Sequence, residues 1–220
     1  MDYEGRRVLV AVSAGIAAYK ACEAVSALVG RGCSVRVIMT PEATKFVGPL
    51  TFEALTGKKV YSDTFDYSDD ASIKHIVFAQ EAEAAIVVPA TADVIAKMAC
   101  GIADDMVSST LLATMCPIIV CPAMHADMYR NPSVEKNLGT LAARGVRLVG
   151  PGEGRLASGD IGRSLLSTTW SLRSWRFWTR LGASRPSPYR FAGNGQTSAT
   201  KHSAHRGFRA WQNSRPKWTH

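Results

Sequence analysis

The chain has 220 residues, 46% of them apolar, which suits one domain with a packed core and a possible tail. No apolar run approaches the roughly 18 residues that a membrane span needs, and the first residues lack a signal-peptide pattern. The five cysteines show neither CxxC nor Cys/His ligand spacing, so we expect reduced thiols, a cytoplasmic protein and no metal site.

The net charge of +8 comes entirely from the last quarter of the chain. Residues 1–163 hold 16 Lys and Arg against 18 Asp and Glu, a net charge of −2, whereas residues 164–220 hold 10 Lys and Arg and no acid. All five tryptophans also fall in 164–220, where periodic apolar patterning fades. We therefore predict one domain over 1–163 and an irregular or disordered basic tail over 164–220.

The first half of the chain alternates strand and helix patterns. Residues 6–13 (RRVLVAVS) form a near-continuous apolar run typical of a buried parallel strand, and residues 14–32 follow with a helical pattern. We predict a second strand over 34–40, a helical segment in two pieces over 41–57, and a short helix over 72–82.

The second half continues this alternation. The predicted elements are a strand over 84–90, one or two helices over 91–114, a strand over 117–124, a helix over 131–145 and a strand over 146–151. The alternation predicts an α/β protein with a three-layer, doubly wound, mainly parallel sheet. Ligands in such sheets bind beyond the carboxyl ends of the strands, so the residues that follow each strand are candidate site residues.

Four strand ends carry such residues. "SAGIAAYK" (13–20) either offers small residues and helix N–H groups to a single phosphate or forms a tight turn without a ligand. Thr91 or Asp93 is placed to cap the helix after the third strand. "CPAMHADMYRNP" (121–132) follows the fourth strand, and five glycines in "GPGEGRLASGDIGRS" (150–164) predict a mobile loop that is a candidate substrate lid.

Two histidines are candidate acid–base groups. His75 lies beside the apolar run "IVFA", where a packed or capping histidine and a catalytic one both fit the pattern. His125 follows the fourth strand, at the edge where this fold class binds ligands.

Taken together, the motifs between Gly5 and Arg163 resemble one family, the flavin-dependent cysteine decarboxylases that convert 4′-phosphopantothenoylcysteine to 4′-phosphopantetheine in coenzyme A synthesis. Each string alone is weakly specific, but their order and spacing are highly specific. They read "GIAAYKACE", "VRVIMTPEATKFVGPLTFEALTG", "HIVFAQEAEAAIVVPATADVIAKMACGIADD", "CPAMHADMY" and "GRLASGDIG".

The resemblance implies a homotrimer or homododecamer with noncovalent flavin mononucleotide (FMN) at subunit contacts and a small-molecule substrate. It implies cofactor contacts from the first turn and second strand end (Ser13, Ala14, Gly15, Ile16, Thr40, Thr44) and from the third and fourth strand ends (Thr91, Ala92, Asp93, Ala123). It implies catalytic roles for His75 and Ser158. It implies substrate contacts by His125, Met128, Arg155, Leu156 and Ala157.

Three positions depart from many family members. His125 and Asp93 stand where Asn is common, and Asp93 would bring negative charge near the flavin. Ser158 stands where many relatives have a Cys that protonates the enethiolate product, and a serine hydroxyl is a far weaker acid. We therefore expect Ser158 to weaken the final reduction without affecting loss of CO₂.

Other functions remain open from the sequence. A peptidyl-cysteine decarboxylase, a flavin prenyltransferase and a noncatalytic regulatory subunit share the same resemblance, although His75 and "PAMH" argue against the prenyltransferase. We find no nucleotide-binding pattern for a phosphopantothenate–cysteine ligase domain. Binding of nucleic acid by the basic tail rests only on charge and tryptophans, so we expect no nucleic-acid partner.

Overall fold

The computed structural model describes residues 3–66 and 72–150, and the backbone alone at 152–155 and 161–164. All of these residues belong to one compact unit. The predicted domain boundary at 163/164 falls at the limit of the described residues, so the boundary and the irregular tail stay predictions. No helix among the described residues is long and apolar enough to cross a membrane.

A five-stranded parallel sheet forms the centre of the fold, in the order β2-β1-β3-β4-β5. This confirms the predicted α/β class with a doubly wound parallel sheet. The strands are β1 (Arg7–Val12), β2 (Ser34–Met39), β3 (Ala84–Ala90), β4 (Ile118–Pro122) and β5 (Arg147–Leu148). All seven residues of β3 are buried, as expected for a central strand covered on both faces.

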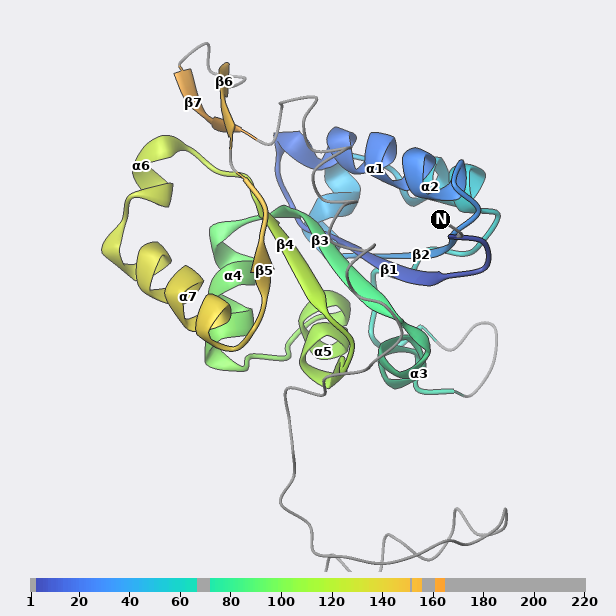
Figure 1. Ribbon diagram of the computed structural model, residues 1–220. Coiled ribbons are helices and arrows are strands. Elements are labelled where there is room, and N and C mark those ends of the chain that lie inside the picture. The colour runs from blue at the N-terminus through green and yellow to red at the C-terminus, as the bar shows by residue number, and fades with distance from the viewer. Residues whose placement is uncertain (1–2, 67–71, 151, 156–160, 165–220) are drawn as a thin grey trace, which may run out of the picture. The chain divides into compact units, whose positions relative to one another are not determined.

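Helices cover both faces of the sheet (Figure 1). On one face lie α1 (Tyr19–Val29) and α2 (Pro49–Thr56). On the other lie α3 (Lys74–Glu81), α4 (Ala92–Cys100), α5 (Met106–Ala113) and α7 (Pro132–Ala143). Gly101 ends α4 in the left-handed conformation that favours glycine, which resolves the predicted helical segment over 91–114 into two helices.

Four local features differ from the sequence predictions. The predicted helix over 14–32 begins with a short 3₁₀ turn, η1 (Ile16–Ala18), and the first piece of the 41–57 segment is the 3₁₀ helix η2 (Pro41–Lys45). The residues after β4 form the one-turn helix α6 (Ala126–Tyr129), because His125 caps it. β5 has only two residues, where a strand over 146–151 was predicted.

The glycine-rich segment also differs from the expected loop. The strands β6 (Gly152–Arg155) and β7 (Ile161–Ser164) pair antiparallel, with Gly152 opposite Ser164 and Arg155 opposite Ile161. Backbone hydrogen bonds therefore order two parts of this segment. Of the predicted lid residues, Arg155 lies in β6, whereas Leu156, Ala157 and Ser158 lie outside the described residues.

Candidate active site

The ends of β1 and β3 are joined by one buried hydroxyl. Ser13 follows β1, and its Oγ donates a hydrogen bond to the Pro89 carbonyl oxygen at 2.7 Å. Oγ of Ser13 also accepts a hydrogen bond from the backbone N–H of Thr91 at 3.0 Å. Ser13 is almost fully buried, so these two bonds satisfy a hydroxyl that water cannot reach. The first and third strand ends are thereby held together, as their neighbouring positions in the sheet require.

Gly15 lies beside this junction. A Cβ atom built at Gly15 would be 3.9 Å from Cγ2 of Thr91, and the φ angle of 157° is one that residues with a side chain rarely adopt. Ala14 is half-buried, and the Ile16 side chain is 64% exposed at the start of η1. The first turn therefore presents backbone, small residues and one exposed apolar side chain at the carboxyl edge of the sheet.

Thr40 and Thr44 frame the turn after β2. Thr40 is buried, and its hydroxyl caps η2 by accepting a hydrogen bond from the Ala43 N–H at 3.2 Å. Its own N–H donates to the Val12 carbonyl oxygen at 3.0 Å, next to Ser13. The Thr44 hydroxyl is exposed and donates to the Pro41 carbonyl oxygen at 2.6 Å. Thr40 thus belongs to the same edge as Ser13, with Thr44 one turn further out.

The helix after β3 begins with the predicted cap. Thr91 is the N-cap of α4, and its hydroxyl accepts a hydrogen bond from the Val94 N–H at 3.4 Å. Ala92 and Asp93 form the first turn. The Asp93 side chain is 67% exposed and lies 3.3 Å from Nζ of Lys97. The negative charge expected near the cofactor is therefore partly balanced by a lysine one turn along the helix.

Lys97 joins Asp93 to a network of ion pairs that was not predicted from the sequence. Its Nζ lies 3.0 Å from carboxylate oxygens of both Asp104 and Asp105, in addition to Asp93. Burial lowers the pKa of Lys97, but hydrogen bonds to Asp105 and Asp104 outweigh it and raise that pKa above its ordinary value. The i, i+4 spacing of Asp93 and Lys97 indicates an ion pair on a helix from the sequence alone. The contacts of Lys97 with Asp104 and Asp105, across the turn after α4, could not be predicted in this way.

The fourth strand end brings Ala123 and His125 to the same edge. The Ala123 N–H donates to the Ala90 carbonyl oxygen at 2.9 Å, which places Ala123 next to the end of β3. Nδ1 of His125 lies 3.3 Å from the Asp127 N–H and 3.5 Å from the Asp127 carboxylate. Nδ1 accepts from the amide when unprotonated and donates to the carboxylate when protonated, so Asp127 engages it in either state. Met128, on α6, is 49% exposed.

His75 lies in the first turn of α3. This helix runs from the carboxyl edge toward the amino edge, since its far end leads into β3. Within the described residues, the Nδ1 atom of His75 is buried and has no hydrogen-bond partner. No hydrogen bond or ion pair among these residues joins His75 to the other strand ends. A buried polar side-chain atom without a partner is uncommon in proteins.

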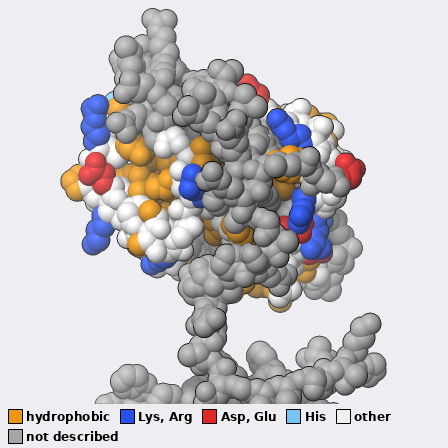
Figure 2. Space-filling model, viewed as in Figure 1, with side chains coloured by type: hydrophobic (Ala, Val, Ile, Leu, Met, Phe, Trp, Pro, Cys, Tyr) orange, Lys and Arg blue, Asp and Glu red, His pale blue; other side chains and the backbone are white. Residues whose placement is uncertain are grey.

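A patch of apolar side chains covers the region between α4 and α6 in Figure 2. Ala92 on α4, Tyr129 on α6 and Met124 between β4 and α6 are partly buried and pack against the core. The described strand ends therefore combine buried hydroxyls, helix starts and apolar surface. They bring together the predicted residues of the first four strand ends.

Three comparisons place the chain among known proteins. The family model described as "Flavoprotein" matches residues 1–173. The coenzyme A biosynthesis bifunctional protein CoaBC of Bacillus subtilis is 49% identical over 161 residues, covering 73% of this chain and 40% of that protein. CoaBC of Mycobacterium tuberculosis is 44% identical over 161 residues, covering 73% of this chain and 38% of that protein. The chain thus spans about two fifths of the length of these curated relatives.

Solved structures agree with the sequence matches. A PPC decarboxylase variant in complex with pantothenoylaminoethenethiol has a TM-score of 0.71 and 26% identity, covering 80% of this chain and all of that chain. The FMN-dependent cysteine decarboxylase SpaF has a TM-score of 0.65 and 31% identity, covering 76% of this chain and 93% of that chain.

Proposed function

The chain belongs to the flavoprotein family, and on this premise we propose that it is an FMN-dependent decarboxylase of 4′-phosphopantothenoylcysteine that acts in coenzyme A biosynthesis. The family resemblance inferred from sequence motifs is confirmed by the family model and the curated relatives. The observation that carries the proposal is the junction of the first, third and fourth strand ends, where Ser13, Thr91 and Ala123 are linked by hydrogen bonds through β3.

The residues at this junction fit FMN. No acidic residue lies in the first turn of η1 or α1, so a phosphate there meets helix N–H groups without repulsion from a carboxylate. The missing side chain at Gly15 leaves room for a group beside Thr91. The exposed Ile16 and the apolar patch near α4 and α6 suit a planar ring system.

The proposed holding set follows from these positions. The phosphate and ribityl chain would be held by Ser13, Ala14, Gly15, Ile16, Thr40 and Thr44. The ring would be held by Thr91, Ala92, Asp93 and Ala123. When bound, FMN supplies a hydride acceptor and donor, which makes loss of CO₂ from a cysteinyl carboxylate feasible.

The protein's own residues would position substrate and move protons. The buried Nδ1 of His75, which has no hydrogen-bond partner among the described residues, can accept the proton of the substrate thiol. His125, whose Nδ1 is engaged by Asp127, presents Nε2 to the substrate carboxylate beside Met128. Arg155, Leu156 and Ala157 would cover the substrate, and Ser158 would stand where the product is protonated.

We also propose a homotrimeric or homododecameric, cytoplasmic enzyme. Several large apolar side chains of the described residues are exposed, among them Phe65 (77%) and Leu50 (74%), and association would bury such surface. Nδ1 of His75, without a partner in the described part of the chain, is consistent with a site that a second copy completes.

The second candidate is a decarboxylase of peptidyl cysteine, which the similarity to the FMN-dependent cysteine decarboxylase SpaF favours. A noncatalytic flavin-binding regulator is the third, since the FMN-binding protein AtHal3 has a TM-score of 0.71 and 25% identity. All three bind flavin, so substrate turnover separates them.

The deciding experiment measures flavin binding and then turnover. The purified protein should be yellow or take up FMN, and it should release CO₂ from 4′-phosphopantothenoylcysteine faster than from a peptide that ends in cysteine. Gly15→Ala should weaken FMN uptake, because the added Cβ occupies the space beside Thr91 and the φ angle of 157° disfavours a side chain. Gly139→Ala is the matched control, because a Cβ there meets nothing within 4 Å. A folded protein that binds no FMN would overturn the proposal.

A further inference from the structure

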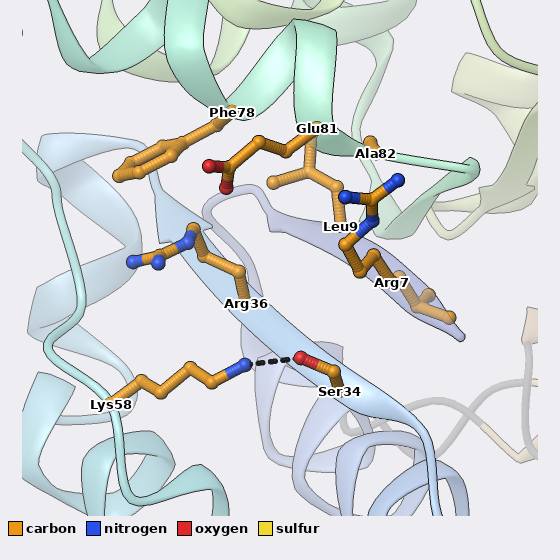
Figure 3. A pocket seen from close by; sticks show the side chains of 9 residues that line it. Arg7, Leu9, Ser34, Arg36, Lys58, Phe78, Glu81 and Ala82 are labelled. Atoms are coloured by element: carbon orange, nitrogen blue, oxygen red, sulfur yellow. Dashed lines mark hydrogen bonds between the residues drawn. The ribbon is translucent and has the colours of Figure 1, made fainter. Parts of the chain in front are cut away.

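A small pocket lies at the opposite, amino edge of the sheet (Figure 3). It is formed by the first residues of β1 and β2, the segment after α2, and the last turn of α3. Arg7 begins β1 and Ser13 follows its end, so a strand rise of about 3.3 Å per residue separates the pocket from the candidate active site by about 20 Å. A ligand in this pocket is therefore distinct from the cofactor and substrate.

The pocket gathers more positive than negative charge. Arg7, Arg36 and Lys58 line it together with one carboxylate, Glu81. Among the described residues, no ion pair involves any of the three cationic side chains or Glu81. The lining therefore carries a formal excess of two positive charges. Glu83, outside the pocket, interacts electrostatically with Arg7, so the excess is concentrated at Arg36 and Lys58.

Two of these cations are held in place. Nζ of Lys58 donates a hydrogen bond to Oγ of Ser34 at 2.6 Å, the dashed line in Figure 3. The Arg36 guanidinium carbon lies 4.3 Å from the centre of the Phe78 ring, a cation–π contact that limits its movement. Both side chains are half-buried, so their charges are only partly screened by water.

The positive charges of Arg36 and Lys58 repel each other. Burial and the positive charge of Arg36 lower the pKa of Lys58, and only Glu81 acts in the opposite direction. An anion bound between Arg36 and Lys58 would raise the pKa of Lys58 again, because it favours the charged form of the lysine. The preorganised cations and the serine hydroxyl offer the donors that a phosphate group binds.

The size of the pocket limits what it can enclose. Its volume is about 120 Å³, well below the roughly 300–1,000 Å³ of pockets that enclose drug-sized ligands. A phosphate group fits this space and a whole nucleotide does not. We propose that the pocket binds the phosphate dianion of a phosphomonoester, with the rest of that molecule in solvent, at a second site separate from the decarboxylation chemistry.

Titration calorimetry tests this on the full chain loaded with FMN and then freed of unbound FMN, so that the first-turn site is filled and no free phosphomonoester competes for the pocket. Inorganic phosphate should give a saturable heat that sodium chloride and succinate at equal ionic strength do not. Arg36→Gln and Lys58→Met should each weaken phosphate binding at least tenfold, whereas Lys136→Met, an exposed lysine on α7, should leave it unchanged. Circular dichroism checks that each variant is folded. If only one of the two pocket variants folds, its phosphate affinity alone tests the proposal.

Lys58 provides a second readout. At alkaline pH, where inorganic phosphate is already a dianion, binding should be accompanied by proton uptake, seen as a heat that depends on the buffer's ionisation enthalpy. This uptake should disappear in Lys58→Met. No saturable phosphate heat, equal binding of succinate, or folded pocket variants that bind like the wild type would each overturn the proposal.

Discussion

The backbone N–H of Thr91, the N-cap of α4, donates a hydrogen bond to Oγ of Ser13 at 3.0 Å. Ser13 directly follows β1, so this bond ties the start of α4 to the end of that strand. The same hydroxyl donates to the Pro89 carbonyl oxygen. One side chain therefore fixes the relative position of the turn proposed for the FMN phosphate and the turn proposed for its ring.

Ser13→Ala should destabilise the protein and weaken FMN binding together. The substitution leaves the Thr91 N–H and the Pro89 carbonyl without this partner, which we expect to lower the free energy of unfolding by about 1–3 kcal/mol. Chemical denaturation and FMN titration measure the two effects. Ser133→Ala removes an exposed hydroxyl on α7 and should change stability by less than about 0.5 kcal/mol. Equal stability of both variants would contradict the role assigned to Ser13.

Lys97→Met should destabilise the protein at neutral pH by about 1–2 kcal/mol, because three carboxylates lose their common partner. Lys20→Met, which breaks the surface pair with Glu23, should cost about 0.5 kcal/mol or less. Denaturation curves at fixed pH compare the two variants, and equal losses would argue against a special role for the Lys97 network.

The effect of Lys97→Met should also depend on pH. The raised pKa of Lys97 means that its stabilisation is fully present below the ordinary lysine pKa and is lost only as alkaline pH passes the folded value. The hydrogen bond to Lys97 lowers the pKa of Asp104, so that contribution is present above the ordinary aspartate pKa and disappears as the pH falls through the folded value. The difference between wild type and variant should therefore be constant near neutrality and shrink in strong acid.

His75→Asn should retain FMN and lose turnover. We expect CO₂ release to fall by about 10²–10⁴-fold, the usual contribution of a general base. His125→Asn should keep far more activity, since asparagine can still cap α6 and donate a hydrogen bond to a carboxylate. Flavin absorbance and CO₂ release measure both variants, and undiminished turnover in His75→Asn would refute its assignment as the base.

Ser158→Cys should change the product without changing the rate of CO₂ loss. A thiol is a better acid than a hydroxyl, so we expect the yield of reduced thiol product to rise about tenfold or more. Ser164→Cys adds a thiol to β7 and should have no such effect. Parallel measurement of CO₂ and of the reduced product tests the hypothesis, which equal product yields in wild type and Ser158→Cys would rule out.

The elements were predictable where a local pattern was long. Val- and Ile-rich runs identified β1, β2, β3 and β4 within a few residues, because burial on both faces leaves an apolar run that needs no partner to be seen. β5 was overestimated, because its apolar run continues beyond the two residues that pair with β4. The one-turn α6 was missed, because four residues are too few for a helical period to appear.

The motifs and their order determined the family, the fold class and the list of candidate site residues, since these depend on residue identity and spacing along the chain. Only the tertiary structure decided which residues meet. Ser13 and Thr91 are 78 positions apart, and Lys97 reaches Asp104 and Asp105 across a turn, so their contacts arise from strand order and helix packing. The pocket of Arg36 and Lys58 likewise exists only because β2 and the segment after α2 come together at the amino edge of the sheet. The spacing of these residues along the chain does not predict that contact.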